Sequence, residues 1–268
     1  MLISRSITLR IFIGILLLAF AISCLWLPST LFMFTIELLS AGLAYEFCRA
    51  KFPDSPVTLR IGTAIFSTVI VAIIYQEIHE FILVSLLGLT VIISIFLLAT
   101  NKKGYKINCI WVLFGILYTS VLPAHLLLLK HLEHEFAFLL LLLIAVVATD
   151  SGAYFVGSSV GRHKLWKSVS ANKTWEGAFG GLLLGSILVL LSLQLISTFD
   201  YPIFKMVIIA VLLCVSTIFG DLFESAIKRK IGIKDFSNIL LDHGGVLDRT
   251  DSLVFTGMTF FWIQRLIS

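Results

Sequence analysis

Residues 136–158 have the sequence FAFLLLLLIAVVATDSGAYFVGS, in which Asp150 is the only charged residue. A helix needs about 20 mostly apolar residues to cross the ~30 Å hydrocarbon layer of a bilayer. Within lipid a single segment must be helical, because the helix alone satisfies its own backbone N–H and C=O groups. The stretch therefore predicts a membrane-spanning helix.

The rest of the chain has the same composition. Of its 268 residues, 59% are hydrophobic and 13% are charged, and the mean hydropathy is +1.03. Soluble domains carry about 25% charged residues, so this chain has too few polar side chains to coat a soluble domain. The four cysteines have no metal-binding or redox spacing. We predict one all-α domain over residues 1–268, a polytopic integral membrane protein.

Nine apolar segments are delimited by charges, prolines and glycines. They are Ile7–Leu27, Leu31–Phe47, Leu59–Tyr75, Phe81–Ala99, Asn108–Leu129, Phe136–Ser158, Trp175–Ile196, Ile203–Ile227 and Ser252–Ile267. The first could be a lipoprotein leader ending in AISC at Cys24, but a cleaved leader should release a soluble domain. We therefore expect nine transmembrane helices, the first one retained.

The basic residues indicate the orientation of these helices. With nine crossings, 17 of the 20 lysines and arginines fall on the side of the N-terminus, and only Lys130, Lys205 and Arg265 fall on the other. Cytoplasmic loops of membrane proteins are enriched in lysine and arginine. The asymmetry favours a cytoplasmic N-terminus. We expect helices of structural character over residues 1–135 and the active site within residues 136–268.

The first candidate motif is FGDLFESAIKRK, residues 219–230. If the preceding apolar helix continues, four polar residues share one helical face: Asp221, Glu224, Ser225 and Lys228. The basic cluster at its end is also typical of a helix that ends on the cytoplasmic side. Asp221 follows an apolar stretch directly, where an unpaired carboxylate costs several kcal/mol. We expect a cation, a lysine or a metal beside it.

The second motif is KDFSNILLDHGGVLDRTDS, residues 234–252. Asp248 and Asp251 fall three residues apart at the expected start of the last helix, where Asp251 can cap free N–H groups. Capping does not account for the other carboxylates of the stretch. Gly244–Gly245 would let backbone approach a ligand closely, and a phosphate would suit the neighbouring His243 and Arg249. A simple turn is the alternative.

The third motif is SVSANKTWEG, residues 168–177. We expect Ser170, Lys173 and Thr174 to open a helix that Thr174 caps, with Glu176 at its positive end. Trp175 suits the membrane interface. A capped, anchored helix start explains the motif, and a helix N-terminus beside Lys173 is also an anion site.

Asp150 lies deep in its apolar segment. It either pairs with another residue to lock the bundle or lines a polar substrate cavity. Acids, bases and glycines thus gather at the cytoplasmic ends of the last four helices. This combination suits a polyphosphate with a divalent metal, which carboxylates hold while basic side chains neutralise the phosphates. The motifs of P-loop ATPases, dinucleotide-binding proteins and zinc proteases are absent.

Residues 225–251, SAIKRKIGIKDFSNILLDHGGVLDRTD, resemble the motif of the phosphatidate cytidylyltransferases, or CDP-diacylglycerol synthases, of bacteria. That pattern is S-x-x-K-R-x(4)-K-D, a spacer, and H-G-G-x-x-D-R-x-D. Eight polar positions match: Lys228, Arg229, Lys234, Asp235, His243, Asp248, Arg249 and Asp251. GDLFES and KTWEG also look like that family. Leu241–Asp242 replaces the usual Pro-Gly, and Ala171–Asn172 replaces the usual Pro-Lys.

The resemblance implies the reaction of CTP with phosphatidate to give CDP-diacylglycerol and pyrophosphate, with Mg²⁺ and an optional second cation. It implies an enzyme of phospholipid biosynthesis in the inner (cytoplasmic) membrane, with its active site facing the cytoplasm. CTP, phosphatidate and the lipid bilayer are then its partners, and no nucleic acid is expected. A homodimer is left open beside a monomer.

Residue roles follow from the same resemblance. Asp221 and Asp248 would be the metal ligands, with Asp251 as a further ligand or a support for one. Lys173, Lys228 and Arg249 would clamp phosphates. The nucleotide site would be lined by Ser170, Thr174, His243, Gly244 and Gly245.

Three alternatives to this function differ in what they require. A transporter with Asp150 and Asp221 as coupling sites needs mid-membrane polar residues in both halves and an internal repeat, and the sequence has neither. A CTP-using lipid kinase is related chemistry, whereas an alcohol phosphotransferase needs a D-G-x-x-A-R run that is absent. A homologue without activity is the third alternative, because of the two departures.

Overall fold

The computed structural model describes residues 2–76, 109–196, 201–241 and 244–267. Within these residues the chain forms eight helices and one two-stranded sheet. The elements are α1 Leu2–Cys24, α2 Ser29–Lys51, α3 Val57–Tyr75, α5 Cys109–Lys130, α6 Glu135–Val160, β1 Lys164–Trp166, β2 Ser170–Thr174, α7 Trp175–Leu195, α8 Ile203–Ile231 and α9 Leu247–Ile267. The predicted segment Phe81–Ala99 lies outside the described residues.

The helices confirm a polytopic all-α membrane protein. Six of them are long and apolar enough to cross a bilayer, namely α2, α3, α5, α6, α7 and α8. The described apolar part of α1 is shorter, Phe12–Cys24. The last helix, α9, is not among the six, and it carries four charged side chains, three of them in its first two turns. Six crossings are thus supported by length and composition, where nine were predicted.

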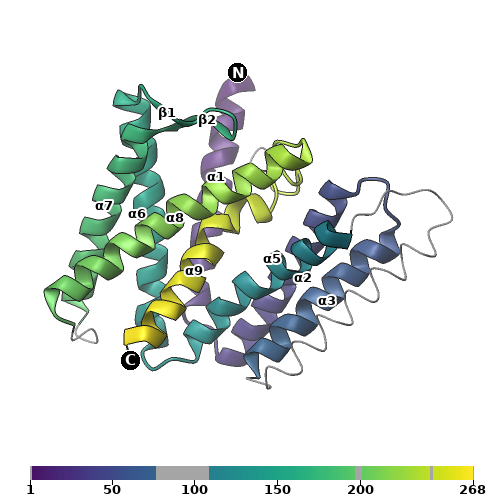
Figure 1. Cartoon of the computed structure of the whole chain (residues 1–268), viewed down its shortest axis with the longest axis horizontal. Coiled ribbons are helices and arrows are strands. Elements are labelled where there is room, and N and C mark those ends of the chain that lie inside the picture. The colour runs from purple at the N-terminus through teal and green to yellow at the C-terminus, as the bar shows by residue number, and fades with distance from the viewer. Residues whose placement is uncertain (1, 77–108, 197–200, 242–243, 268) are drawn as a thin grey trace.

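The helices form two groups joined by α8 and α9 (Figure 1). In one group α6 packs along α7, and in the other α2, α3 and α5 pack against one another. The antiparallel pair α8 and α9 lies between them, with α8 against α6 and α7 and α9 against α5. The N-terminus lies at the top of the view and the C-terminus at the bottom. One apolar core spans both groups, from Phe32 of α2 to Leu193 of α7.

A β-hairpin replaces the helix start expected at residues 170–174. β1 and β2 are antiparallel, with Lys164 opposite Thr174 and Trp166 opposite Ser170. The helix α7 begins only at Trp175, capped as predicted by Thr174, whose Oγ1 accepts a hydrogen bond from the Gly177 N–H at 3.1 Å. A two-stranded ribbon leaves backbone groups at its edges unpaired, which lipid does not tolerate and water does. The hairpin therefore belongs at the end of the bundle.

A stripe of small residues brings α7 against α6. Gly177, Gly181 and Gly185 recur every four residues on the buried face of α7. A Cβ at Gly181 would lie 2.5 Å from the Thr149 carbonyl oxygen of α6. Small residues let membrane helices approach closely, so this stripe sets the distance between the two helices. Asp150 is the residue of α6 that follows Thr149, so it lies at the level of Gly181 on α7.

Candidate active site

Two acid–base pairs lie where the hairpin, α8 and the start of α9 meet. Lys173 of β2 forms an ion pair with Asp221 of α8. Lys228, two turns further along α8, is paired with Glu224 and with Asp248 of α9, each at 2.8 Å between the Lys228 Nζ and a carboxylate oxygen. The expectation that α8 continues through its polar face is confirmed, since the helix ends only at Ile231. Asp221 thus has the lysine partner that its apolar surroundings required.

The hairpin is fastened to α8 by a second contact. The Arg229 Nε donates a hydrogen bond to the Val169 carbonyl oxygen at 3.1 Å, and Val169 lies in the turn between the strands. A charged donor to a carbonyl contributes about 1.5–3 kcal/mol. This contact holds the hairpin beside α8, and Lys173 is thereby kept beside Asp221.

Asp248 holds the loop that precedes α9. Its Oδ2 accepts hydrogen bonds from the backbone N–H groups of Phe236 and Gly245, at 2.9 and 2.8 Å, while its Oδ1 accepts from Lys228. Gly244 has a φ of +84°, which favours glycine, and a Cβ there would lie 3.0 Å from Asp248 Oδ2. The first glycine therefore allows the turn that Asp248 closes.

Asp248 and Asp251 both lie inside α9, not at its cap, because the helix begins at Leu247.

Glu46 of α2 binds the same loop from the other half of the chain, and sequence reasoning did not single it out. Its Oε1 accepts hydrogen bonds from Ser237 Oγ at 2.6 Å and the Val246 N–H at 3.1 Å. Its Oε2 accepts from the Leu247 N–H at 2.9 Å. The side chain is only 2% exposed, and a Cβ at Gly245 would lie 2.8 Å from Glu46 Oε2. The second glycine thus makes room for this carboxylate.

Glu46 could have been suspected from one feature of its segment. It is a carboxylate near the basic C-terminal end of an apolar helix, within AGLAYEFCRAK, and a buried carboxylate needs donors. The sequence did not indicate which donors those are, because they are backbone N–H groups about 200 residues away.

Further carboxylates surround Asp221. Asp150 interacts electrostatically with Asp221, Lys173 and Arg249, and Asp251 interacts with Asp221 and Asp150. Asp150 is exposed although it lies well inside an apolar helix. This exposure favours the interpretation of Asp150 as a lining residue over that of a fully buried pairing residue. Glu224 is completely buried, and among the described residues its Oε2 has no hydrogen-bond partner.

The two predicted metal ligands have different ion-pair partners. Asp221 lies with Lys173, Asp150 and Asp251, whereas Asp248 lies with Lys228 and the loop. Within residues 2–76, 109–196, 201–241 and 244–267, no three His, Cys, Asp or Glu side chains form a ready metal cage. Metal binding at Asp221 and Asp248 therefore stays a prediction.

The remaining predicted site residues have different positions. Ser170 begins β2, and Thr174 is buried as the helix cap, with its Oγ1 occupied by Gly177. Arg249 is exposed on the first turn of α9, and its positive charge attracts the Asp150 carboxylate. His243 and the unexpected Asp242 lie outside the described residues.

Comparison with known proteins bears on this arrangement. The model of a family described as the cytidylyltransferase family matches residues 8–267. The chain belongs to this family. The match includes α2 with Glu46 as well as the hairpin, α8 and α9.

Relatives named phosphatidate cytidylyltransferase occur in several bacteria. The chain is 42% identical over 125 residues to that of Bacillus subtilis (strain 168), covering 47% of this chain and 46% of the relative. It is 44% identical over 118 residues to that of Staphylococcus epidermidis (strain ATCC 35984), covering 44% and 45%. It is 28% identical over 256 residues to that of Aquifex aeolicus (strain VF5), covering 95% and 90%. The chain thus spans about half the length of the first two relatives and most of the third.

Proposed function

We propose that this protein transfers the cytidylyl group of CTP to phosphatidate, giving CDP-diacylglycerol and pyrophosphate. The observation that carries the proposal is the convergence of Lys173–Asp221 and Lys228–Asp248 on one end of an apolar bundle, in a chain of the cytidylyltransferase family. Charged groups of both signs at the end of membrane-spanning helices suit a reaction between a lipid phosphate and a soluble nucleotide.

The proposed reaction is an exchange at phosphorus. A phosphate oxygen of phosphatidate bonds to the α-phosphorus of CTP, and the bond to the β-phosphate oxygen breaks with its electron pair leaving on pyrophosphate. The attacking oxygen is already anionic near neutral pH, so no strong general base is needed. The work of the protein is to align two anions and to neutralise the charge that builds up between them.

Three cations supply that neutralisation in the proposal: Lys173, Lys228 and Arg249. Lys173 is 26% exposed and Lys228 is 12% exposed, and both are held by carboxylates. Phosphate oxygens can take the place of a carboxylate oxygen beside either lysine. Ser170 and the segment His243–Gly245 are the proposed nucleotide contacts, whereas Thr174 supports the site as the cap of α7.

We propose Mg²⁺ binding at Asp221 and Asp248, and their surroundings suit it to different degrees. Asp221 is 36% exposed and has neighbouring carboxylates at Asp150 and Asp251, a donor set of the oxygen type that Mg²⁺ prefers. Asp248 is 4% exposed and both its oxygens are bonded, so it would have to give up Lys228 to bind a metal. Bound Mg²⁺ would offset charge on the triphosphate and polarise its oxygens.

The proposed topology has nine crossings, a cytoplasmic N-terminus and an inner-membrane location. The excess of lysine and arginine on one side supports it. The site would then face cytoplasmic CTP while the acyl chains of phosphatidate stay in the bilayer. A reporter fused after residue 268 should be active only outside the cytoplasm, and a cytoplasmic result would contradict the nine crossings.

The activity is tested with purified protein in detergent, CTP labelled at the α-phosphate, phosphatidate and Mg²⁺. We expect labelled lipid that appears only when phosphatidate and Mg²⁺ are both present. Asp221→Asn is the matched control, because it removes one charge from a partly exposed side chain and keeps its shape. The proposal is wrong if wild type yields no labelled lipid, or if this variant yields as much.

A further inference from the structure

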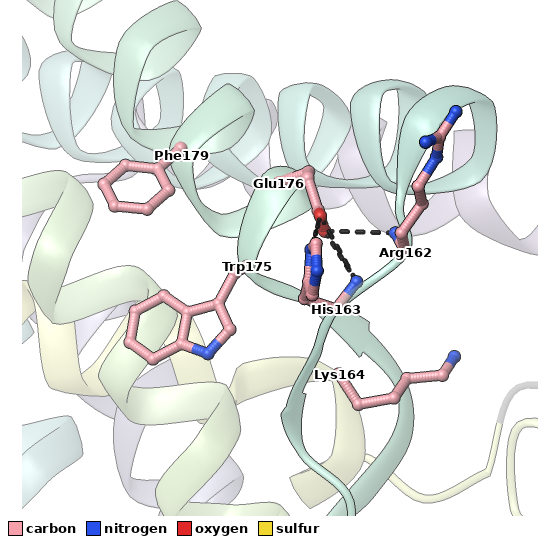
Figure 2. Close-up of a pocket in the computed structure, with 6 residues that line it drawn as sticks. All are labelled: Arg162, His163, Lys164, Trp175, Glu176 and Phe179. Atoms are coloured by element: carbon pink, nitrogen blue, oxygen red, sulfur yellow. Dashed lines mark hydrogen bonds and ion pairs between the residues drawn. The ribbon is translucent and has the colours of Figure 1, made fainter.

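A second group of basic and aromatic residues lies outside the proposed active site. It lines a pocket of about 710 Å³ where the chain leaves α6 and enters α7 (Figure 2). The lining residues are Arg162, His163, Lys164, Trp175, Glu176 and Phe179. None of them belongs to the acid–base pairs described above.

Both carboxylate oxygens of Glu176 have bonding partners within the pocket. One of its carboxylate oxygens accepts hydrogen bonds from the backbone N–H groups of Arg162 and His163, at 3.1 and 3.2 Å. The other lies 2.5 Å from the His163 Nδ1. Glu176 therefore fixes the backbone that carries Arg162 and Lys164, and its negative charge is already shared among these donors.

The side chains of Arg162 and Lys164 are exposed. Among the residues that the structure describes, the carboxylate of the pocket bonds only the backbone of Arg162 and no atom of Lys164. Figure 2 shows the two cationic side chains on one side of Glu176 and the two aromatic rings on the other. The pocket thus has a cationic side and an apolar side.

The apolar side continues along α7 toward the middle of the membrane span. Trp175, Phe179 and Leu183 recur every four residues and are 51%, 63% and 65% exposed. They lie on the face opposite the glycine stripe that packs on α6. Because α7 is long and apolar enough to cross a bilayer, this exposed face meets lipid, with Trp175 at the level where tryptophan is enriched.

We propose that this pocket binds an anionic phospholipid, with the headgroup phosphate at Arg162 and Lys164 and an acyl chain along Trp175, Phe179 and Leu183. A ligand with an anionic head and an apolar tail matches both sides of the pocket at once, which a free anion does not. The proposal rests on α6 and α7 spanning the bilayer, and it does not depend on the transferase reaction. Each basic residue near an anionic surface contributes about a fivefold increase in binding.

Contact between the pocket and lipid can be measured by fluorescence. The full chain is reconstituted in phosphatidylcholine nanodiscs that contain a fixed fraction of a dibrominated lipid, either phosphatidylglycerol or phosphatidylcholine. Bromine quenches tryptophan on contact, and the difference between wild type and Trp175→Phe isolates the emission of Trp175. Phosphatidylglycerol is the probe because it is anionic without being the proposed substrate, so lipid binding is measured apart from catalysis.

We expect brominated phosphatidylglycerol to quench Trp175 at about 25-fold lower mole fractions than brominated phosphatidylcholine, which is about fivefold for each of the two basic residues. Arg162→Gln and Lys164→Gln should each weaken this preference about fivefold, and the double variant should abolish it. Lys167→Gln, which removes a charge from the hairpin outside the pocket, should leave the preference unchanged. The charge-conserving pair Arg162→Lys/Lys164→Arg should retain it, which separates loss of charge from misfolding.

Three outcomes would overturn the proposal. Wild type could quench equally with both lipids, the double variant could keep the preference, or Lys167→Gln could reduce it as much as the pocket variants do. A fourth arm adds inorganic phosphate at the headgroup concentration, balanced with an inert salt in the control. If phosphate alone removes the preference, the pocket takes a free anion and the lipid assignment is wrong.

Discussion

Glu46 and Leu247 are 201 positions apart in the chain, and Glu46 Oε2 accepts a hydrogen bond from the Leu247 backbone N–H at 2.9 Å. Through this contact and those to Ser237 and Val246, α2 holds the loop that leads into α9. The loop also carries Gly245, which donates to Asp248. The N-terminal half therefore helps to position the proposed site.

Replacing Glu46 with Gln should lower activity more than stability. The amide retains one oxygen acceptor but turns an NH₂ group toward a backbone donor, and each lost hydrogen bond to a charged group is worth about 1.5–3 kcal/mol. We expect kcat to fall at least tenfold while most of the protein remains folded. Steady-state kinetics and thermal unfolding of the same preparation measure the two effects.

Glu37→Gln is the matched control, because Glu37 lies on the same helix and forms none of the bonds to the loop. It should retain wild-type kcat. Ser237→Ala removes only one of the three bonds and should have a smaller effect than Glu46→Gln. Equal kcat in Glu46→Gln and wild type would show that Glu46 does not position the site.

Lys228→Met should be strongly destabilising. Lys228 bonds both Glu224, which is 0% exposed, and Asp248, which is 4% exposed. Loss of the cation leaves two buried carboxylates without their partner, and breaking a buried pair costs about 3–5 kcal/mol. Thermal unfolding in detergent measures the loss. Lys230→Met, at an exposed position two residues further along, should change stability little, and an equal loss there would refute the assignment.

A double substitution separates stability from chemistry at Lys228. Glu224→Gln/Lys228→Met removes one of the two stranded charges and should recover part of the lost stability. Activity should not recover, because the proposed phosphate clamp is still missing. Recovery of both together would indicate that Lys228 serves stability alone.

Asp221→Asn and Asp248→Asn should fail in different ways. Asp221 is 36% exposed, and exposed ion pairs contribute about 0–1 kcal/mol, so its variant should stay as stable as wild type. We expect it to need much more Mg²⁺ for any remaining activity.

Asp248→Asn should lose stability as well, since Asp248 Oδ1 and Oδ2 hold Lys228 and two backbone N–H groups. Titration of activity with Mg²⁺, beside thermal unfolding, separates the two; an unchanged Mg²⁺ requirement in Asp221→Asn would exclude it as a ligand.

Gly181→Ala should destabilise the packing of α6 on α7. The added Cβ would lie 2.5 Å from the Thr149 carbonyl oxygen, which is backbone and cannot rotate away, and such overpacking costs about 1–3 kcal/mol. Gly62→Ala on α3 is the control, because nothing lies within 4 Å of its Cβ. That variant should be neutral or more stable by about 0.5–1 kcal/mol. A neutral Gly181→Ala would contradict the close approach of the two helices.

Much of the fold could be predicted from the apolar segments, because lipid leaves a chain segment few structures other than a helix. The segment Ile203–Ile227 is an example, and the structure has it within α8. The cap at Thr174 was predicted from its hydroxyl before an apolar segment, and it is also found. The hairpin was missed, because a short polar connection in water has no such constraint. The start of α9 at Leu247 was also missed, since its first turns are polar and resemble a loop in sequence.

The candidate site was predictable where its residues lie on one helix face or in one motif. Glu224 and Lys228 were placed on one face by their spacing, and they do bond to each other. The pairings Lys173–Asp221 and Lys228–Asp248 depend on how separate helices pack, which spacing does not reveal. The contact of Glu46 with Leu247 is the extreme case, because its donors are backbone groups that any sequence would supply.

The most direct measurement of the proposed reaction uses two labels on CTP. In parallel reactions with phosphatidate, one CTP carries ³²P at the α-phosphate and the other at the γ-phosphate. Cytidylyl transfer predicts that the α label enters the lipid fraction while the γ label is released as pyrophosphate. Transfer of the γ label to lipid would mean a lipid kinase, and lipid labelled by neither CTP would contradict the proposed transferase.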